Sequence, residues 1–295
     1  MALAEAHAGL HRPGLGIALM LAAWFLFSLV DTSVKWLVIA GLPAAQLSFM
    51  RYLGHFAISV ARMGQGGFRR ARFRVRHPGL VIARALLLVS ATAFNFYVLK
   101  YLPLTITSAI MFSAPIIVCL LSWPVLGERV GPWRWFAIML GFGGVMVVIR
   151  PFDAGFQWAA LVPLYNAFAL ALYSIITRRL AGIEPVETLQ FYMGAIGTVI
   201  LLPFAFAGWQ NPGDTRDWLL FVALGLWAWG GHELLIRAHG MAPANTLMPY
   251  TYSFIIYLSI TSYLVFAHVP DIWTMVGAAI IAGSGLIIWA RENRQ

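Results

Sequence analysis

Ten stretches of roughly twenty predominantly apolar residues follow one another along this 295-residue chain, separated by short segments rich in charge, glycine or proline. An α-helix needs about 20 such residues to cross the hydrocarbon layer of a membrane. The stretches cover about 14–38, 44–62, 79–100, 103–125, 132–149, 157–178, 186–206, 217–239, 243–267 and 271–290. Continuous runs of this length exclude a membrane β-barrel, whose strands alternate over roughly ten residues. The sequence therefore predicts an all-α polytopic membrane protein with ten transmembrane helices.

Composition supports a membrane protein and excludes several other classes. The chain is 61% hydrophobic and only 11% charged, and its mean hydropathy is +0.79, whereas soluble domains are about a quarter charged. The net charge of +9 comes from basic residues between apolar stretches, not from a basic face on a soluble domain, so no nucleic-acid partner is expected. The single cysteine, Cys119, excludes an intramolecular disulfide. No metal site, cofactor or catalytic residue is predicted.

The distribution of lysine and arginine sets the orientation, because these residues are retained on the cytoplasmic side. The first apolar stretch is too long for a signal-peptide core and is interpreted as a retained helix. With the N-terminus inside, only Lys100, Arg150 and Arg216 fall outside. The inside segments hold Arg12, Arg62, Arg69, Arg70, Arg72, Arg74, Arg76, Arg129, Arg134, Arg178, Arg179, Arg237, Arg291 and Arg294. Both termini are therefore expected in the cytoplasm, with the segment 69–77 near anionic lipid headgroups.

A repeat relates the two halves of the chain. A shift of 140 residues superposes equivalent helix positions: Pro103 with Pro243, Ser113 with Ser253, Val125 with Val265, Trp133 with Trp273, and Gly143 with Gly283. Two five-helix units are implied, 1–150 and 151–295. Because five is odd, the second unit is inverted in the membrane, an arrangement typical of transporters with a central site.

The two copies of this repeat also carry a family resemblance. The segment 113–149 has a proline in its first helix, a short turn at Gly127 and Glu128, and a glycine-rich second helix. It resembles the drug/metabolite transporter superfamily, specifically its ten-helix EamA-type branch, over essentially the whole chain. The second copy, 253–289, departs by carrying Ala267 and His268 where glycine and glutamate would stand. Within that branch, the aromatic-rich composition is most similar to bacterial aromatic amino acid exporters, which implies residence in the cell inner membrane.

Polar stripes on the first two helices mark candidate cavity walls, since ionisable groups at membrane depth pair with one another or face water. Positions three or four apart share a helix face. The stripes comprise Trp24, Ser28, Asp31 and Lys35 on the first helix, and Ser48, Arg51, His55, Ser59 and Arg62 on the second. We expect an Asp31–Lys35 ion pair near the outer interface, with Trp24, Ser28, Arg51 and His55 lining a cavity in which Arg51 binds a carboxylate. A packing role for His55 is the alternative.

The segment WAWGGHELLIRAHG, 227–240, concentrates three kinds of ionisable group in an apolar helix. Glu233 and Arg237 stand four apart with the acid first, the favourable order for a helix pair, and are assigned a structural or gate role. Trp229 and His232 lie on other faces and are assigned to the cavity. The glycine pair before His232 predicts either a kink or close helix packing.

Further candidates come from the remaining helices. Additional substrate-binding positions are Asn95, Tyr165, Tyr250, Phe254 and Tyr257, although aromatic stripes at helical spacing also serve packing. The fifth and tenth helices carry small residues four apart: Ala137 with Gly141, and Ala279 with Gly283. Such spacing favours close helix packing, so these helices are interpreted as scaffold or dimer contact, in a monomer or homodimer.

The motifs disfavour the rival functional classes, of which an intramembrane enzyme is the main one. His232 and Glu233 begin like a zinc-protease helix, but Ile236 stands where the second histidine is required. A phosphate-binding loop is absent from the sequence, and no repeated ring of carbonyl or acidic residues points to a channel. A secondary transporter with alternating access remains, and the resemblance makes export the default direction. Aromatic and hydrophobic amino acids fit the polar stripes best; phosphorylated or nucleotide sugars and drug-like compounds stay open.

Overall fold

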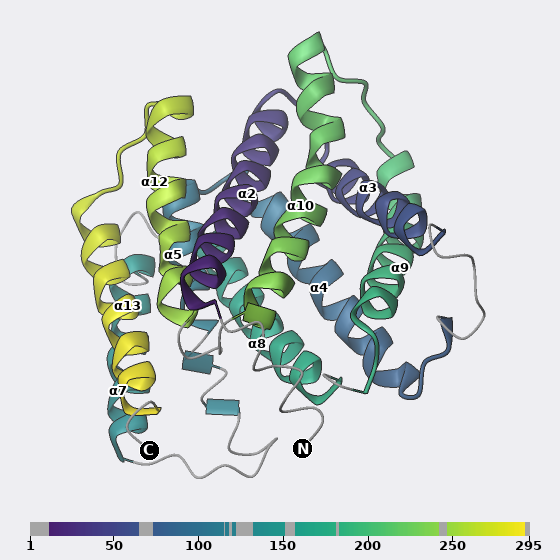
Figure 1. Cartoon of the computed structure of the whole chain (residues 1–295). Helices are drawn as coiled ribbons and strands as arrows, with labels where there is room; N and C mark the ends of the chain where they lie inside the picture. The colour runs from purple at the N-terminus through teal and green to yellow at the C-terminus, as the bar shows by residue number, and fades with distance from the viewer. Residues whose placement is uncertain are drawn as a thin grey trace.

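A computed structural model describes residues 12–64, 73–114, 116–117, 120–121, 132–150, 157–180, 183–241 and 247–292, and these residues form a helical bundle (Figure 1). The helices of the first half are α2 (Pro13–Ile39), α3 (Ala44–Gly64), α4 (Pro78–Val98), α5 (Leu104–Met111) and α7 (Pro132–Ile149). Those of the second half are α8 (Leu161–Leu180), α9 (Val186–Phe206), α10 (Thr215–Met241), α12 (Ser253–Phe266) and α13 (Ile272–Glu292). Short 3-10 turns, η2 (Trp158–Ala160) and η3 (Met248–Tyr252), precede α8 and α12. The predicted ten-helix architecture is confirmed.

Prolines and short acidic side chains set where the helices begin. Helices α2, α4 and α7 start on a proline, whose fixed φ suits the first turn and whose missing N–H is not needed there. At the start of α10 the Asp214 carboxylate accepts a hydrogen bond from the backbone N–H of Asp217 at 2.8 Å. Asp271 does the same for Thr274 at the start of α13, also at 2.8 Å. These caps satisfy N–H groups that would otherwise lack a partner at a helix end.

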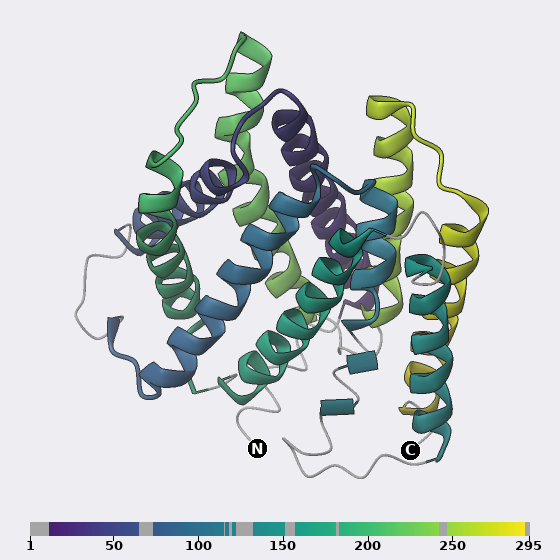
Figure 2. The same ribbon diagram turned by 180° about the vertical axis from the view of Figure 1, so that it is seen from behind.

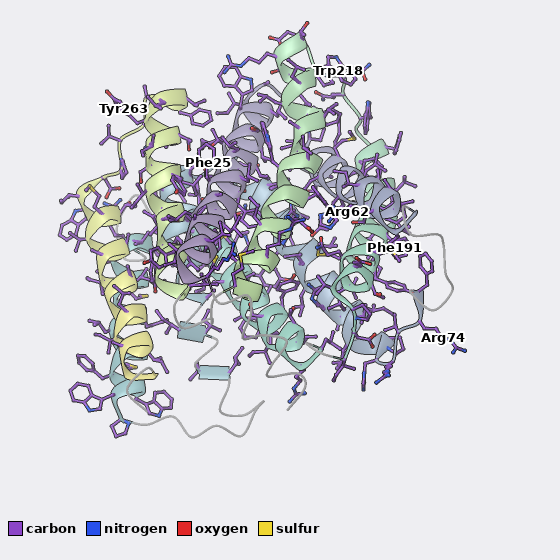
Figure 3. All side chains as sticks on the ribbon, in the orientation of Figure 1. Phe25, Arg62, Arg74, Phe191, Trp218 and Tyr263 are labelled. Atoms are coloured by element: carbon purple, nitrogen blue, oxygen red, sulfur yellow. The ribbon has the colours of Figure 1, made fainter. Side chains whose placement is uncertain are left out.

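Five of the described helices are long and apolar enough to cross a membrane: Gly14–Ile39, Pro78–Val98, Trp158–Thr177, Val186–Phe206 and Thr215–Leu235. Three shorter apolar helices are Trp135–Ile149, Tyr250–Phe266 and Ile272–Ile287. Helix α3 is long but more polar, because it carries the stripe that includes Arg51 and His55. Exposed aromatic side chains such as Trp218 and Tyr263 point away from the bundle (Figure 3), as expected for a surface in contact with lipid.

Helix pairing follows the inverted repeat. The pair α2–α10 has its counterpart in α8–α4, the pair α3–α10 in α9–α4, and the pair α2–α12 in α8–α5. Helices α3 and α9 pack on each other, as do α7 and α13. The start of α2 and the end of α13 lie toward the same end of the bundle (Figure 1). This end is called the inner end below, because the lysine and arginine distribution predicts that it faces the cytoplasm; the opposite end is called the outer end.

The packing of α7 on α13 uses the predicted face of α7, where a Cβ on Gly141 would lie 2.6 Å from the Ser284 hydroxyl of α13, but a different face of α13. A Cβ on Gly144 would approach the backbone oxygen of Gly277 to 3.0 Å, and a Cβ on Gly277 would lie 2.8 Å from that of Gly144. Gly283 has nothing within 4 Å, and Ala279 is exposed. As a contact with α7, the predicted Ala279–Gly283 face is therefore wrong, because Gly277 provides the close approach on α13. The alternative, a dimer contact through this face, stays a prediction. The view from behind shows α7 alongside α13 at one side of the bundle (Figure 2).

Candidate functional site

A cluster of polar side chains from α2, α3 and α4 lies in the interior of the bundle. The Asn95 amide nitrogen donates to a carboxylate oxygen of Asp31 at 3.3 Å. Arg51 donates from Nη1 to the Thr92 hydroxyl at 2.9 Å, and its guanidinium carbon lies 5.1 Å from the centre of the Tyr52 ring. The Arg51 Nε and the Asn95 Oδ1 are buried without a hydrogen-bond partner among the described residues. In this cluster the Asp31 carboxylate and the Arg51 guanidinium are hydrogen-bonded to neutral side chains. The Arg51 Nε and the Asn95 Oδ1 are left to bind a ligand.

Lys35 does not form the ion pair expected for it. Its ammonium donates to the backbone oxygens of Leu99 at 3.2 Å and Leu102 at 2.7 Å, beyond the end of α4. Asp31 instead accepts from Asn95, and the two side chains make no ion pair within the described part of the chain. The prediction of an Asp31–Lys35 pair is therefore wrong. Lys35 satisfies carbonyls at a helix end, and Asp31 remains available in the interior.

Two histidines that the sequence assigned to separate helices meet in the interior. The rings of His55 on α3 and His232 on α10 lie 5.8 Å apart, centre to centre, at an interplanar angle of 77°. His232 also contacts the ring of Phe27 on α2 at 5.0 Å. Both Nε2 atoms are buried without a hydrogen-bond partner among the described residues. These two residues are called the histidine pair below.

Aromatic side chains from α2 and α12 adjoin this interior. Trp24 packs on Phe254 with ring centres 5.2 Å apart and on Phe27 at 5.6 Å. The indole N–H of Trp24 is buried without a described partner. Ser28 is fully buried, but its hydroxyl donates to the backbone oxygen of Phe25 on its own helix at 2.7 Å. Trp24 and Phe254 therefore form an aromatic wall, while Ser28 is occupied within its helix.

Two of the three tyrosines among the candidates, Tyr165 and Tyr257, lie apart from this cluster. Tyr165 is 40% exposed, and its hydroxyl pairs with that of Ser90 at 2.8 Å on the surface between α4 and α8. Tyr257 packs edge-on against the exposed Phe25 at 5.5 Å. Tyr250 packs beside a small apolar cluster that includes Met20. The structure thus brings together Trp24, Asp31, Arg51, His55, Asn95, His232 and Phe254. Tyr250 packs against the same apolar cluster as Trp24, whereas Tyr165 and Tyr257 are not brought to these residues.

An ion-pair cluster closes the inner end between α3 and α10. One carboxylate oxygen of Glu233 accepts from Arg62 Nη2 at 2.8 Å and from Arg237 at 2.8 and 3.0 Å. The Glu233–Arg237 pair is the one expected from the sequence, and Arg62 on α3 joins it. Arg62 also lies over the Trp229 ring at 5.3 Å and points toward the space between α10 and α9 (Figure 3). These contacts tie α3 to α10 at this end.

A pocket of about 200 Å³ lies beside the ion pairs. Its walls include Ser59, Arg62, Glu187, Gln190 and Trp229. Ser59 stands one turn after His55 on α3, and its hydroxyl donates to the backbone oxygen of His55 at 2.9 Å. The pocket therefore extends from the inner surface toward the histidine pair.

Loss of the Glu233 charge is expected to loosen this end without unfolding the protein. An exposed ion pair contributes at most about 1 kcal/mol, so Glu233→Gln should raise the rate of maleimide labelling at Ser59→Cys by up to about fivefold. The measurement uses inside-out vesicles and a Cys119→Ser background, which removes the single native cysteine. Glu187→Gln removes the same charge from the same pocket and is the matched control. An equal increase in the labelling rate of both variants would contradict a specific role of Glu233 in holding α3 to α10.

At the outer end, polar contacts join the two halves of the chain. Gln46 and Gln210 exchange two hydrogen bonds, side chain to backbone oxygen at 2.7 Å and backbone N–H to side chain at 2.9 Å. The indole of Trp36 donates to Asp217 at 2.9 Å. Thr32 donates to the Thr261 hydroxyl at 2.8 Å. The outer ends of α2, α3, α10 and α12 are thus held by contacts between the two repeats.

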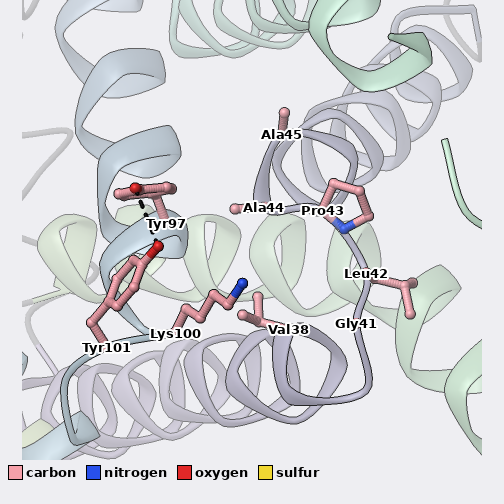
Figure 4. A pocket seen from close by; sticks show the side chains of 9 residues that line it. All are labelled: Val38, Gly41, Leu42, Pro43, Ala44, Ala45, Tyr97, Lys100 and Tyr101. Atoms are coloured by element: carbon pink, nitrogen blue, oxygen red, sulfur yellow. Dashed lines mark hydrogen bonds between the residues drawn. The ribbon is translucent and has the colours of Figure 1, made fainter. Parts of the chain in front are cut away.

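A second pocket, of about 430 Å³, lies at the outer surface. It lies between the α2–α3 connection and the end of α4, where Tyr101 donates to the Tyr97 hydroxyl at 3.3 Å and Lys100 faces the loop (Figure 4). None of the predicted site residues lines it. This pocket is a feature of the outer surface, separate from the interior cluster.

Sequence reasoning missed several residues of the interior. Thr92 stands three residues before Asn95 on the same face of α4, so helical spacing was a usable signal. Gln190 and Tyr52 gave no such signal, because a single polar residue near the start of a helix, or a tyrosine beside an arginine, is common. The Gly127–Glu128 turn and Cys119 lie outside the described residues. Within the described residues, no group of three or more His, Cys, Asp or Glu side chains is placed to hold a metal ion.

Comparison with known proteins agrees with this architecture. The chain matches the EamA-like transporter family in two copies, over residues 14–150 and 157–290. It is 28% identical to a riboflavin transporter of Rhizobium johnstonii, covering 96% of this chain and 94% of that protein. It is 28% identical to an S-adenosylmethionine uptake transporter of Rickettsia felis, covering 92% of each, and 26% identical to a pseudopaline exporter of Pseudomonas aeruginosa, covering 90% and 93%.

A solved crystal structure shares the fold, with a TM-score of 0.66 and 19% identity over 95% of this chain and 98% of the other. The match in two copies, the full-length relatives and the ten-helix bundle lead to the same conclusion. The chain belongs to the EamA-like transporter family of the drug/metabolite transporter superfamily and is a multi-pass protein of the bacterial inner membrane.

Proposed function

We propose that this protein is a secondary carrier of small metabolites that combine a planar or bulky apolar group with a zwitterionic head, with aromatic and hydrophobic amino acids as its first candidates. Two inverted units, 1–150 and 151–295, with both termini in the cytoplasm, would alternate access to the site between them. Helices α7 and α13 would remain packed as the scaffold. The catalytic alternative has no support in the family or in the names of the relatives.

The observation that carries this proposal is the placement of Asp31 and Arg51. Both charges lie in the interior of a membrane protein, where an ionisable side chain costs several kcal/mol unless it is compensated. Each makes its hydrogen bond with a neutral partner, Asn95 and Thr92 respectively, and the two charges act on each other without a direct ion pair among the described residues. A zwitterion would compensate both charges, with its carboxylate on Arg51 and its ammonium on Asp31. A guanidinium also matches a carboxylate in geometry better than an ammonium does.

The aromatic wall supports a ring or a large apolar side chain in the substrate. Trp24 and Phe254 are in contact in the interior, and the Trp24 indole N–H has no described partner. Aromatic pairs contribute roughly 0.5–1.5 kcal/mol beyond the area that they bury. At the inner end, Trp229 in the pocket beside Gln190 would receive the same group on its way in or out.

A riboflavin-like substrate is the second candidate, favoured by the relative named for riboflavin. Riboflavin has a planar ring system but no carboxylate, so it would leave the charge of Arg51 uncompensated. Phosphorylated or nucleotide sugars would favour Arg51 and Arg84 acting together. Arg84 instead donates to Tyr173 at 2.6 Å and Thr177 at 2.7 Å, which makes this alternative weaker. Drug-like compounds lack a specific observation in their favour.

The relatives include proteins named for uptake and one named for export, so the similarity selects no direction. Export therefore remains an expectation taken from the family resemblance alone.

Counterflow in proteoliposomes tests the proposed function. Vesicles are preloaded with one unlabelled compound each, namely phenylalanine, tyrosine, leucine, alanine or riboflavin, and the uptake of labelled phenylalanine is followed. We expect exchange with the first three and little with alanine. Trp229→Ala should lower uptake about three- to tenfold, from the loss of roughly 1 kcal/mol of aromatic contact.

The matched control is Trp218→Ala, an outward-facing tryptophan on the same helix, which should leave uptake within twofold. Labelled riboflavin is measured in parallel with unlabelled riboflavin inside. Exchange of riboflavin without exchange of phenylalanine would replace the first candidate by the second. No exchange of any of these compounds would remove both.

A further inference from the structure

The histidine pair is a buried titratable site that the proposed mode of substrate binding does not use. His55 and His232 come from helices of different repeats and have ring centres 5.8 Å apart. Neither Nε2 has a hydrogen-bond partner among the described residues, although both atoms are buried. A buried polar atom without a partner costs about 1–3 kcal/mol, so two of them on facing rings call for a function.

Water has a polar route to the pair from the inner end. Gln190 lines the inner pocket, and its Oε1 is buried without a hydrogen-bond partner among the described residues. Ser59, one turn from His55 on the same helix, lines the same pocket. A proton from the cytoplasmic water therefore has polar side chains along its path to the imidazoles.

We propose that His55 and His232 form a proton-binding site that couples substrate movement to a pH gradient. The proton is taken from water and is held at an imidazole nitrogen of the pair. Histidine suits this role, because its charge changes near neutral pH in water and small changes in its surroundings shift that titration. The inference rests on the carrier function proposed above.

The charges around the pair determine the sign of the coupling. Arg51 on α3 and Arg84 on α4 are the charged groups that act on both imidazoles. From the other elements, α9 presents the neutral Gln190, α2 presents Phe27, and Glu233 on α10 is occupied by Arg62 and Arg237. Two guanidinium charges repel a third positive charge on the histidine pair. A substrate carboxylate on Arg51 compensates one of them and so favours the proton.

Substrate and proton would then bind together and move in the same direction. For one proton per zwitterion, a gradient of one pH unit at zero membrane potential supports at most about tenfold accumulation, because one unit corresponds to 1.36 kcal/mol. The substrate accumulates on the alkaline side.

The test uses the full-length protein in liposomes, with the membrane potential clamped at zero by potassium and valinomycin. Labelled phenylalanine is supplied outside at pH 6.5, with the lumen at pH 7.5 or at pH 6.5. We expect accumulation several-fold higher with the alkaline lumen, and substrate-dependent acidification of the lumen reported by a trapped pH-sensitive dye. His55→Gln and His232→Gln should each reduce the ratio of the two uptakes to about one, whatever their own uptake at equal pH. His268→Gln, beyond the outer end of α12, is the matched control and should keep the ratio.

The dye signal from the unaltered protein decides the question even if a histidine variant fails to fold. Phenylalanine counterflow is measured in the same vesicles, so loss of carrier function is distinguished from loss of coupling. Counterflow with no effect of the pH gradient would overturn the proposal. Accumulation on the acid side, or full coupling in both histidine variants, would overturn it as well.

Discussion

Replacing Arg51 by glutamine is expected to lower the counterflow of phenylalanine by roughly 30- to 150-fold. Hydrogen bonds between a charged donor and a charged acceptor contribute about 2–3 kcal/mol when they are shielded from water. Glutamine keeps a donor for Thr92, which Arg51 contacts at 2.9 Å, but it removes the charge that would hold the substrate carboxylate. The side chain is shorter, so some loss of fit is included in this range.

A substrate without a carboxylate isolates this interaction. Phenethylamine retains the ring and the ammonium of phenylalanine, so it should exchange weakly with the unaltered protein and lose little more in Arg51→Gln. The measured quantity is the difference between the loss that Arg51→Gln causes for phenylalanine and the loss that it causes for phenethylamine. A difference is expected because groups in direct contact give non-additive effects when both are changed. Equal losses for phenylalanine and phenethylamine would show that Arg51 does not bind the carboxylate.

The matched control for this experiment is Arg84→Gln. Arg84 is also a buried arginine, but it donates to Tyr173 and Thr177 and lies over the Tyr173 ring at 4.4 Å. Its loss should lower the stability of the α4–α8 contact and affect both compounds alike. A carboxylate-selective loss in Arg84→Gln would move the binding role from Arg51 to Arg84.

Helix positions were predictable from the sequence, and side-chain partners only in part. The predicted stretches 44–62, 132–149 and 186–206 correspond to α3, α7 and α9 almost residue for residue, because the length and hydrophobicity of a membrane span are local properties. The Glu233–Arg237 pair was predictable for the same reason, since both residues stand on one helix. The meeting of His55 with His232 was not, because it depends on how α3 crosses α10.

The errors have the same origin. Asp31 and Lys35 have the spacing of a helix pair, yet Lys35 finds backbone oxygens at Leu99 and Leu102, more than sixty residues away in the sequence. The glycine pair in α10 allowed a kink or close packing, and the structure shows packing. α10 is continuous from Thr215 to Met241, and a Cβ on Gly231 would lie 2.7 Å from the Phe27 ring. Local spacing limits the choices, and the partner helix selects among them.

Replacing Gly225 by alanine is expected to lower the free energy of unfolding by about 2–3 kcal/mol, at the upper end for inserting one methyl group into a packed interior. A Cβ on Gly225 would lie 2.5 Å from the Cα of Gly54 and 3.0 Å from its carbonyl carbon. A Cβ on Gly54 would in turn lie 2.8 Å from the Cα of Gly225. The obstacle is backbone on both sides, so no side-chain rotation relieves it, and α3 and α10 must move apart.

Gly143→Ala on α7 is the matched control, because nothing lies within 4 Å of its Cβ position. Alanine is favoured over glycine in a helix interior by up to about 1 kcal/mol, so this variant should be as stable as the unaltered protein or more stable. Thermal unfolding followed by size-exclusion chromatography should place Gly225→Ala roughly 5–10 °C below Gly143→Ala, at about 2–4 °C per kcal/mol. Equal midpoints would contradict a backbone contact at this crossing.

The same crossing determines whether the interior site exists. Gly54 precedes His55 and follows Arg51 by three residues, and Gly225 lies two turns before His232 on α10. If a methyl group separates the two helices, the histidine rings move apart along with the backbones that carry them. Gly225→Ala protein that remains folded at low temperature should therefore lose pH-driven accumulation before it loses counterflow, since the proton site needs both helices while Arg51 and Asp31 stand on α3 and α2.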